Sequence, residues 1–409
     1  MSAPQWTISV LLIFSFASVY PAKAKMITLV HYNIKELDST KLRSTPMCLQ
    51  LTSVKNIIKK WDFDILSVNE MQFDLPGVPS PRYSSRGENM HLFANLLEKA
   101  EFKDTFHPAN TGGNAKKRPD GTYATNPNTP EAQTLADQVN FGSFPAQYST
   151  GALFRFPQKR IIEIHDLKWK DFNKNLDLSN FKEPNGTPLP TDMPLFDKNF
   201  SDVVLDVDGQ ELHLILLHTV PSYHFGNMAS PNFQRNADQL RFLEWYLTGQ
   251  TDLTVNLADI TPLPQGSYAV AVGDFNVGLS STDPRQVGAQ VLSRLAKKWI
   301  LWMPNPDYTN DGDGVRVKPM QLLLDFIFLS PNLTKIQGGI YHPEANLTFP
   351  HSPTEIAPSG MVEVLVKEQN NERRAFVNAD YLECKNGSDH YPLWASFEIP
   401  PKKINDKKK

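Results

Sequence analysis

Residues 269–276 read Ala-Val-Ala-Val-Gly-Asp-Phe-Asn, an apolar β-type run that ends in a carboxylate and an amide. Near the end of the chain, residues 388–392 read Ser-Asp-His-Tyr-Pro and lead into a second apolar run, 392–399. Polar side chains at the ends of apolar strands lie at the rim of a sheet, where functional groups gather. Taken alone, Asp274 and Asn276 also fit an Asx turn, and Asp389 also fits a turn.

Three earlier segments repeat this arrangement of polar residues after apolar runs. Asn33 and Glu70 follow the apolar runs 26–30 and 63–68, and His218 ends a third run. If these strand ends share one rim, their side chains converge on one pocket. Carboxylates, amides and imidazoles suit a hard cation and a phosphoryl group. Singly, Glu70 also fits a helix cap, and a lone histidine is more often a satisfied, partly buried side chain.

Asp325 has a different setting, because apolar residues surround it on both sides. Residues 322–324 are Leu-Leu-Leu and residues 326–328 are Phe-Ile-Phe. A carboxylate inside so apolar a strand costs free energy unless a partner satisfies it. The sequence therefore predicts that Asp325 has a fixed partner.

The order of these residues resembles the motifs of the endonuclease/exonuclease/phosphatase superfamily, which includes deoxyribonuclease I. The series is Asn33, Glu70, His218, Asp274-Phe275-Asn276, Asp325 and Ser388-Asp389-His390. Residues 217–222, Leu-His-Thr-Val-Pro-Ser, look like the histidine stretch of deoxyribonuclease I, and the resemblance runs from about 26 to 399. A weaker similarity, to secreted bacterial members of poorly defined substrate, rests on Phe141-Gly142, Gln147-Tyr148 and Arg155-Phe156-Pro157.

The chain departs from the family pattern at two places. Phe154 stands where a serine usually precedes the motif arginine, and the stretch after Asn276 lacks the frequent proline. Neither departure removes a catalytic group. In addition, the acidic partner that deoxyribonuclease I-like enzymes place beside the first histidine is not identifiable for His218 from the sequence.

The resemblance implies a role for each matching residue. Glu70 and Asp389 would hold Mg²⁺, with Mn²⁺ and Ca²⁺ as alternatives, and Asn33 would place the metal or the scissile phosphate. Asp274 would orient or deprotonate the attacking water, and Asn276 would hydrogen-bond the phosphate. His390 would act as a base or phosphate ligand, and Asp325 would orient its imidazole. His218 would donate to a phosphoryl oxygen or the leaving group, and Arg155 would bind the substrate.

The family resemblance also implies the fold, an α+β, four-layer sandwich of two packed mixed β-sheets flanked by helices. Nearly all-apolar strands suit sheets covered on both faces, so one layered domain over 25–400 fits better than two. Helices are predicted at 44–61, 91–100, 231–247 and 284–298; the predicted strands are 26–30, 63–68, 150–156, 160–165, 203–207, 212–219, 269–272, 322–329 and 392–399. Two polar insertions, at about 107–148 and 168–200, remain unexplained by the family pattern.

Composition and the chain ends bear on location and partners. The 409 residues carry a formal net charge of -3, so no global basic field draws the protein to nucleic acid, although a local basic groove is compatible with that total. Residues 1–24 resemble a signal peptide, because the apolar run 8–19 precedes Ala22-Lys23-Ala24. Residues 401–409 form a basic tail. Cys48 and Cys384 are equally compatible with a disulfide and with two thiols.

The leading hypothesis is a secreted, metal-dependent phosphoesterase that cleaves phosphodiester bonds in the manner of a nuclease. Its substrate is a phosphoester, with DNA or RNA among the candidates, and no stable membrane insertion or protein partner is indicated. The same site also serves lipid phosphodiesterases such as sphingomyelinases, and inositol-phosphate phosphatases. A catalytically inactive binding protein on the same scaffold is a further alternative. Residues 110–148 and 223–236 are the candidates for setting substrate choice.

Overall fold

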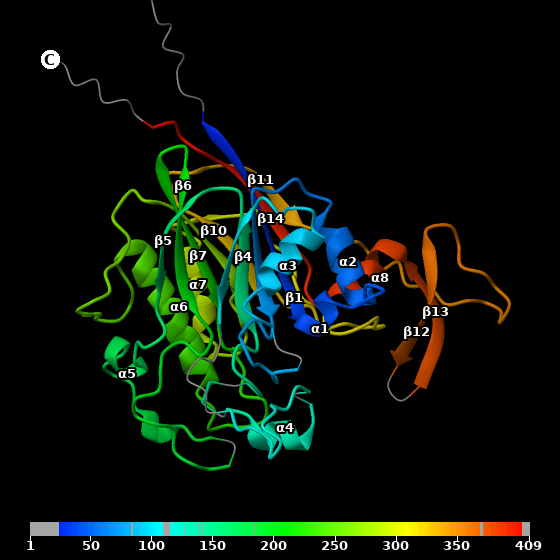
Figure 1. Ribbon diagram of the computed structural model, residues 1–409, viewed down its shortest axis with the longest axis horizontal. Coiled ribbons are helices and arrows are strands. Elements are labelled where there is room, and N and C mark those ends of the chain that lie inside the picture. The colour runs from blue at the N-terminus through cyan, green and yellow to red at the C-terminus, as the bar shows by residue number, and fades with distance from the viewer. Residues whose placement is uncertain are drawn as a thin grey trace, which may run out of the picture.

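The chain folds into four layers. Two six-stranded sheets pack face to face, and helices cover the outer face of each (Figure 1). The α+β sandwich expected from the sequence is therefore confirmed. The computed structural model describes residues 24–402 apart from 83–84, 109–114, 127, 138, 141, 184 and 369–370. The predicted signal peptide, except Ala24, and residues 403–409 of the predicted tail lie outside the described residues.

The first sheet has the strand order β11-β14-β1-β2-β4-β3, in which β1 and β2 are parallel and the other neighbours antiparallel. Its strands are β1 (Lys25–Leu37), β2 (Ile65–Met71), β3 (Lys103–His107), β4 (Ser149–Phe154), β11 (Thr334–Ile340) and β14 (Leu393–Ile399). Strand β2 is almost wholly buried, and β1 is buried over its central residues 29–34, as the sequence predicts for strands covered on both faces.

The second sheet has the order β5-β6-β7-β8-β10-β9, in which β7 and β8 are parallel. Its strands are β5 (Gln158–Glu163), β6 (Phe200–Val207), β7 (Gln210–His218), β8 (Tyr268–Asp274), β9 (Ile300–Leu301) and β10 (Asp325–Leu329). A separate hairpin of β12 (Met361–Glu368) and β13 (Asn371–Asn378) projects from the body of the molecule (Figure 1).

Helices cover the two outer faces. Those by the first sheet are α1 (Ser39–Leu42), α2 (Leu49–Ile58), α3 (Asn89–Leu96) and α8 (Ala379–Gly387). The second sheet carries α6 (Asn232–Thr248) and α7 (Val287–Leu295), which pack on each other. Helix α6 ends at Gly249, whose φ of 71° lies in the left-handed region that glycine adopts most easily.

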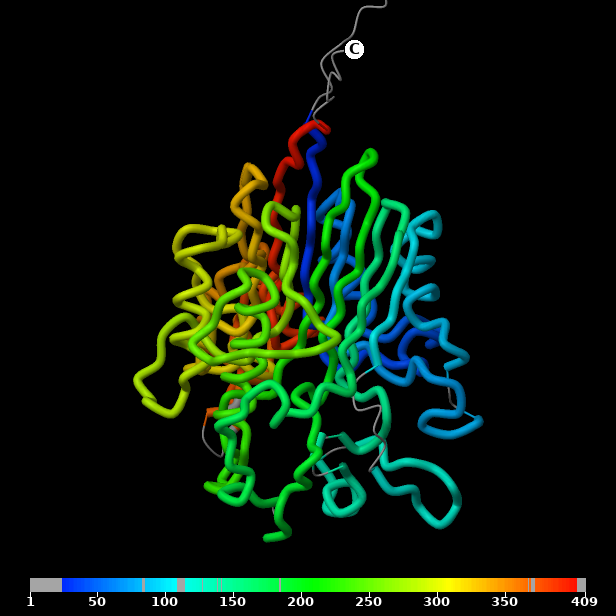
Figure 2. Tube along the Cα trace, turned by 90° about the vertical axis from the view of Figure 1, so that its left-hand side faces the viewer, coloured from blue at the N-terminus to red at the C-terminus, as the bar shows by residue number. Residues whose placement is uncertain are grey.

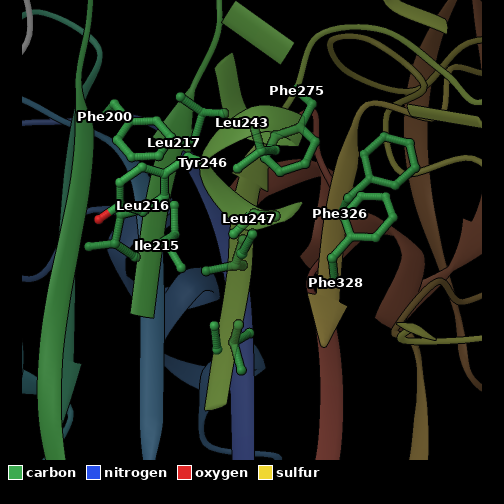
Figure 3. Packing of buried hydrophobic residues seen from close by; sticks show 14 of the residues in the cluster. Phe200, Ile215, Leu216, Leu217, Leu243, Tyr246, Leu247, Phe275, Phe326 and Phe328 are labelled. Atoms are coloured by element: carbon green, nitrogen blue, oxygen red, sulfur yellow. The ribbon is translucent and has the colours of Figure 1, made fainter. Parts of the chain in front are cut away.

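The residues of β1 alternate between two apolar cores. Ile27 and Leu29 belong to the core between the sheets, whereas Val30 and Tyr32 belong to the core under α2 and α8. Because strand side chains alternate, His31 and Asn33 project toward the second sheet. Figure 3 shows the neighbouring layer, where apolar side chains of α6 pack on β6 and β7.

The two polar insertions lie at one end of the sandwich, the lower edge in Figure 2. They contain the short helices α4 (Pro130–Leu135) and α5 (Trp169–Phe172) and the 3₁₀ turn Leu178–Asn180. This is the end at which β1, β2, β7 and β8 finish, so the insertions surround the strand ends (Figures 1 and 2). Within the described residues, none of the helices has the length and apolarity needed to span a membrane.

Several elements differ from the sequence predictions. Strand β10 begins at Asp325 rather than at 322, because Leu322 instead pairs with Asn310. Strands β3 and β11, the hairpin β12–β13 and helix α8 had not been predicted. Both β3 and β11 are edge strands, which carry polar or exposed residues and so lack an apolar signal.

Cys48 and Cys384 are both free thiols, which resolves the alternative that the sequence left open.

Candidate active site

The strand register gathers the candidate residues at one rim. Asn33 pairs with Asn69 across the parallel strands β1 and β2, while His218 pairs with Asp274 across β7 and β8. Asp325 opens the antiparallel strand β10 directly opposite Asp274. A parallel strand that ends and an antiparallel strand that begins at the same edge place their polar residues side by side.

The pairing of β8 with its neighbour β7 requires glycine immediately before Asp274. A Cβ atom at position 273 would overlap the carbonyl oxygen of Leu217, and Gly273 has a φ of 154°. Asp274 follows at once, and its Oδ1 accepts a hydrogen bond of 2.8 Å from the backbone N–H of Asn276. The glycine in the Gly-Asp-Phe-Asn stretch therefore lets the backbone bring Asp274 next to His218.

The carboxylate of Asp274 is the centre of the site. Its Oδ2 accepts a 3.2 Å hydrogen bond from the Asn33 amide. The same oxygen lies 3.7 Å from Nε2 of His218 and 3.8 Å from Nε2 of His390. From the first sheet, Asn69 Oδ1 accepts a 2.8 Å hydrogen bond from the Asp274 N–H. One carboxylate oxygen thus faces an amide and two imidazoles at the junction of the two sheets.

Asp325 has the fixed partner that its apolar surroundings predict, and two further partners besides. Its Oδ2 lies 2.7 Å from Nδ1 of His390 and accepts a 2.7 Å hydrogen bond from the Thr309 hydroxyl. Its Oδ1 lies 3.3 Å from Nε2 of His31, whose Nδ1 is 3.2 Å from the Ser67 hydroxyl. All these side chains are buried. The network fixes the orientation of His390 so that its Nε2 points toward Asp274.

Glu70 and Asp389 make a second acidic group beside Asn33. The Asn33 amide donates a 3.0 Å hydrogen bond to Glu70 Oε1. Ser388 connects the last motif to β1, because its hydroxyl donates a 2.7 Å hydrogen bond to the Asn33 carbonyl. Burial and the charge of Asp389 raise the pKa of Glu70 to about 7. A cation placed between these carboxylates would relieve that repulsion, and oxygen donors of this kind suit Mg²⁺.

A second group of possible metal ligands adjoins the first, through the hydrogen bond between Asn33 and Asp274. One ligand atom from each of Asp274, Asp325 and His390 lies within 4.8 Å of the others, and all three residues are buried. The Asp325–His390 contact is already a short hydrogen bond. Because a metal on His390 Nδ1 would break that bond, Glu70, Asp389 and Asn33 fit a cation better.

The two histidines have opposite electrostatic surroundings. Burial alone would lower the pKa of His390, but the charge of Asp325, its hydrogen bond and the charges of Asp389 and Asp274 together outweigh burial and raise that pKa well above its usual value. For His218, burial and the nearby Lys198 cation lower the pKa well below its usual value. Burial and the Asp325 charge raise the pKa of Asp274 to about 7, against the opposing charge of His390. The site therefore holds one imidazolium and one neutral imidazole.

The partner of His218 is a backbone carbonyl. Its Nδ1 lies 3.1 Å from the carbonyl oxygen of Tyr148, a residue with a positive φ of 63°. A carbonyl oxygen can only accept, so Nδ1 carries the proton and Nε2 of the neutral ring presents a lone pair toward Asp274. This contact explains why the sequence offers no recognisable acidic partner for His218.

Arg155 alone among the predicted site residues lies elsewhere. Phe154 pairs with Ile65, at the start of β2, whereas Glu70 lies near the end of that strand. Six residues of extended chain separate Glu70 from Asp64, the Arg155 partner, which is about 20 Å. The Arg155 guanidinium there lies 3.2 Å from Asp64. The predicted substrate contact of Arg155 is therefore corrected, since antiparallel β4 carries the residue to the opposite end of the sheet.

Four residues at the site were missed from the sequence: His31, Asn69, Thr309 and Tyr148. A signal for His31 did exist, because it precedes Asn33 by two residues and so shares its strand face. Thr309 lies in an irregular segment, and Tyr148 acts through its backbone. Neither of these carries a residue-type signal.

The two insertions contribute most of the lining of a cavity beside the candidate site. It has a volume of about 590 Å³, and its lining includes Asn140, His165, Lys168, Met193 and Lys198. Lys198 links the cavity to the site, because its ammonium donates hydrogen bonds to Asp197 and to the Thr219 carbonyl, the residue after His218. Both polar insertions therefore contribute to the surroundings of the strand-end rim.

The chain matches the model of the Endonuclease/Exonuclease/phosphatase family over residues 30–390. It belongs to this family. The matched range includes every one of the motif residues from Asn33 to His390. Members of the family are hydrolases that act on phosphoester bonds, and they generally use divalent metals.

Solved structures of the family are similar to this chain at low sequence identity. An endonuclease/exonuclease/phosphatase from Beutenbergia cavernae DSM 12333 is 12% identical, with 92% of this chain and 72% of that chain covered and a TM-score of 0.49. TDP2 from Caenorhabditis elegans is 12% identical, with coverages of 92% and 75% and a TM-score of 0.44. A mannosyl-6-phosphatase from Bacteroides thetaiotaomicron VPI-5482 is 12% identical, with coverages of 91% and 100% and a TM-score of 0.43. No curated protein sequence matches the chain significantly.

Proposed function

We propose that this protein is a divalent-metal-dependent hydrolase that cleaves phosphodiester bonds in the manner of a nuclease. The observation that carries the proposal is the setting of Asp274, whose Oδ2 faces the Asn33 amide and the Nε2 atoms of His218 and His390. Phosphodiester hydrolysis needs a group to activate water, donors for the phosphoryl oxygens and help for the leaving group. Side chains suited to all three tasks surround this one carboxylate.

Glu70, Asp389 and Asn33 are the residues we assign to the cation. Burial and the charge of Asp389 raise the pKa of Glu70, whereas the pKa of Asp389 is lowered, against its burial, by His390 and Lys35, so Glu70 is the carboxylate of the two that a bound cation would stabilise most. Their hard oxygen donors suit Mg²⁺, with Mn²⁺ and Ca²⁺ as alternatives. When bound, such a cation supplies Lewis-acid stabilisation of the charge on the phosphoryl oxygens.

Asp274 is the residue we assign to the attacking water. A carboxylate with a pKa of about 7 can accept a proton near neutral pH. Asn276 follows it with a positive φ of 52°, and its amide donates one hydrogen bond of 3.0 Å to the Thr219 carbonyl. The second amide hydrogen is then available to a phosphoryl oxygen.

His390 and His218 divide the remaining tasks by charge. His390 is positively charged, so its Nε2–H donates to the phosphoryl group or the leaving oxygen, and Asp325 keeps the ring oriented. His218 is neutral, with its Nε2 lone pair toward Asp274, so it accepts a hydrogen bond from water or a substrate hydroxyl. This proposal replaces the donor role that the family resemblance implies for His218. Pairs of titratable groups with opposite shifts are typical of acid–base sites.

The decisive experiment compares plasmid DNA and sphingomyelin as substrates of the purified protein, with Mg²⁺ and with EDTA. We expect Mg²⁺-dependent nicking of DNA, lost in H390A and D274A variants that still unfold cooperatively. Release of choline phosphate without nicking would instead favour a lipid phosphodiesterase on the same residues. Full activity in both folded variants would contradict the assignment, and bound metal without hydrolysis of either substrate would contradict the nuclease-like specificity.

We also propose that the mature protein is exported. The support is the sequence pattern of residues 1–24, an apolar run followed by Ala22-Lys23-Ala24. N-terminal sequencing of protein recovered outside the cells tests this directly. We expect the mature chain to begin at Lys25; an uncleaved chain retained in the cells would contradict export.

A further inference from the structure

An exposed cluster of aromatic rings follows His218 along the chain. It consists of Tyr223, His224, Phe225 and Phe233, here called the aromatic platform. The Tyr223 and Phe225 side chains are 49% and 69% exposed, although large aromatic residues usually gain stability from burial. Tyr223 stacks on His224 with ring centroids 4.8 Å apart, and Phe225 stands perpendicular to Tyr223 at 5.4 Å. The rings therefore hold one another in place while leaving surface open to a ligand.

The aromatic platform is attached directly to the segment after β8 that carries Asn276. The Ser222 N–H donates a 3.1 Å hydrogen bond to the Asn276 carbonyl, and the Gln286 amide donates a 3.0 Å hydrogen bond to the Ser222 carbonyl. At the other side, the Arg285 guanidinium lies 4.7 Å from the Phe233 ring centroid. These contacts fix the platform relative to Asn276, the residue assigned to the phosphate.

We propose that the aromatic platform binds an unpaired nucleobase of the nucleotide next to the scissile phosphate. The inference rests on the proposed function and adds that the base next to the cleaved phosphate is unpaired when it binds, whether in a single strand or in a locally opened duplex. Because every base has a π-face, stacking on aromatic side chains binds single strands without strong sequence preference. Because the backbone hydrogen bond from Ser222 to Asn276 joins the platform to the residue assigned to the phosphate, the base next to that phosphate is the one we assign to the platform.

The charges around the platform favour a base over a lipid surface. Arg285 is held by Asp283 through contacts of 3.0 and 2.7 Å, so the charged groups at the platform largely cancel. A loop that inserts into a membrane interface combines its apolar side chains with unpaired basic residues. The paired Asp283 would place a carboxylate against the lipid headgroups, whereas it leaves ring stacking unaffected.

Oligonucleotide binding tests the inference separately from hydrolysis. Fluorescein-labelled oligothymidine and an abasic oligomer of equal length are titrated in Mg²⁺ into the H390A protein, which leaves the strand intact. We expect the oligothymidine to bind roughly tenfold more tightly than the abasic strand. In the H390A protein, Y223A and F225A together should remove that difference in affinity. F225L keeps an apolar side chain without a ring, so it should retain little of the part of the difference that Phe225 provides. I356A, at an exposed apolar residue before β12, is the matched control and should change nothing.

The outcomes separate this inference from the proposed function. A loss confined to oligothymidine, in variants whose thermal unfolding matches the parent, supports the platform even if plasmid nicking fails. Three results would overturn the platform proposal even if the protein nicks DNA. They are no measurable oligothymidine binding by the H390A protein, an equal loss of affinity for both strands in the Y223A/F225A variant, and no loss of affinity for either strand. Loss of binding to phosphatidylcholine–phosphatidylserine vesicles in Y223A/F225A, with oligothymidine binding unchanged, would also overturn it.

Discussion

The buried imidazole of His31 contacts the carboxylate of Asp325 on the side opposite His390. His31 Nε2 lies 3.3 Å from Asp325 Oδ1, while His390 Nδ1 lies 2.7 Å from Oδ2. His31 belongs to the first sheet and Asp325 to the second, so the contact joins the two layers under the site. Burial alone would raise the pKa of Asp325, but His390 and His31 together lower it well below its usual value. His31 is therefore a positioning residue that keeps Asp325 charged and fixed.

Replacement of His31 should lower kcat more than it raises KM. H31A removes a partner that orients Asp325 and through it His390, and losses of about 10-fold to 100-fold are typical for such outer partners. H31Q keeps an N–H donor that can reach Asp325 and should restore most of the activity. Steady-state kinetics on a nicked-plasmid or small phosphodiester assay measures both parameters. A folded H31A protein with unchanged kcat would rule out the positioning role.

Removing the charge of Asp274 while keeping its shape should separate its chemical role from its structural one. D274N retains the shape and the hydrogen bond to the Asn276 N–H but cannot accept a proton, so we expect kcat to fall about 10²-fold to 10⁴-fold. Thermal unfolding should remain cooperative. The matched control is D208N, which changes an exposed carboxylate in the turn between β6 and β7. Wild-type turnover by D274N would refute its assignment as the base.

Metal affinity should fall as the pH drops below about 7. The pKa of Glu70 in the metal-free protein is about 7, and the cation requires the deprotonated carboxylate. Below this pH, a proton must leave Glu70 for each cation bound, so the apparent affinity falls by up to about tenfold per pH unit. Calorimetric titration with Mg²⁺ or Mn²⁺ at several pH values measures this slope. E70Q should bind at least tenfold more weakly and lose this part of the slope; an unchanged slope would exclude Glu70 as a ligand.

Acid stability should depend on Glu163, which connects the edge strands β3 and β5 of the two sheets. Its carboxylate lies 2.5 Å from His107 Nδ1 and 3.2 Å from His165 Nε2. Hydrogen bonds from His107 and His165 lower the pKa of Glu163 from 4.5 to about 2. A depressed pKa contributes stability above pH 4.5 and loses it as the pH falls toward 2.

For this partly exposed group, the shift corresponds to at most about 3 kcal/mol before solvent screening and about 1 kcal/mol after it. Hydrogen bonding to Glu163 also raises the pKa of His165, and that contribution is present below pH 6.5 and lost above the raised value. E163Q should therefore flatten the stability profile between about pH 2 and 4.5. Denaturant unfolding measures this, with E372Q on the exposed hairpin as control. An identical acid slope in E163Q and wild type would contradict the prediction.

Much of the fold was predictable from local patterns. The long helix at 231–247 and the strand at 269–272 carry strong apolar signals, and the structure places helix and strand there as Asn232–Thr248 and Tyr268–Asp274. The edge strand Thr334–Ile340 carries a weak signal, because edge strands bury little apolar surface. Strand β12, in contrast, contains the β-type run Met-Val-Glu-Val-Leu-Val, a local signal that the sequence prediction missed. Helix α8 was missed because its sequence, Ala-Asp-Tyr-Leu-Glu-Cys-Lys-Asn-Gly, has little amphipathic pattern.

Local sequence patterns were sufficient to predict the family, the sandwich and the residues that end its central strands. They were sufficient because the apolar runs and the polar residues that follow them are local features, and their order along the chain is specific. Which of those residues meet, in contrast, depends on how the strands pair in three dimensions. Strand register brought Asp325 opposite Asp274 and His31 under Asp325, while antiparallel β4 carried Arg155 to the far end of the sheet. Contacts between residues up to hundreds of positions apart depend on sheet order and register, which no local pattern specifies.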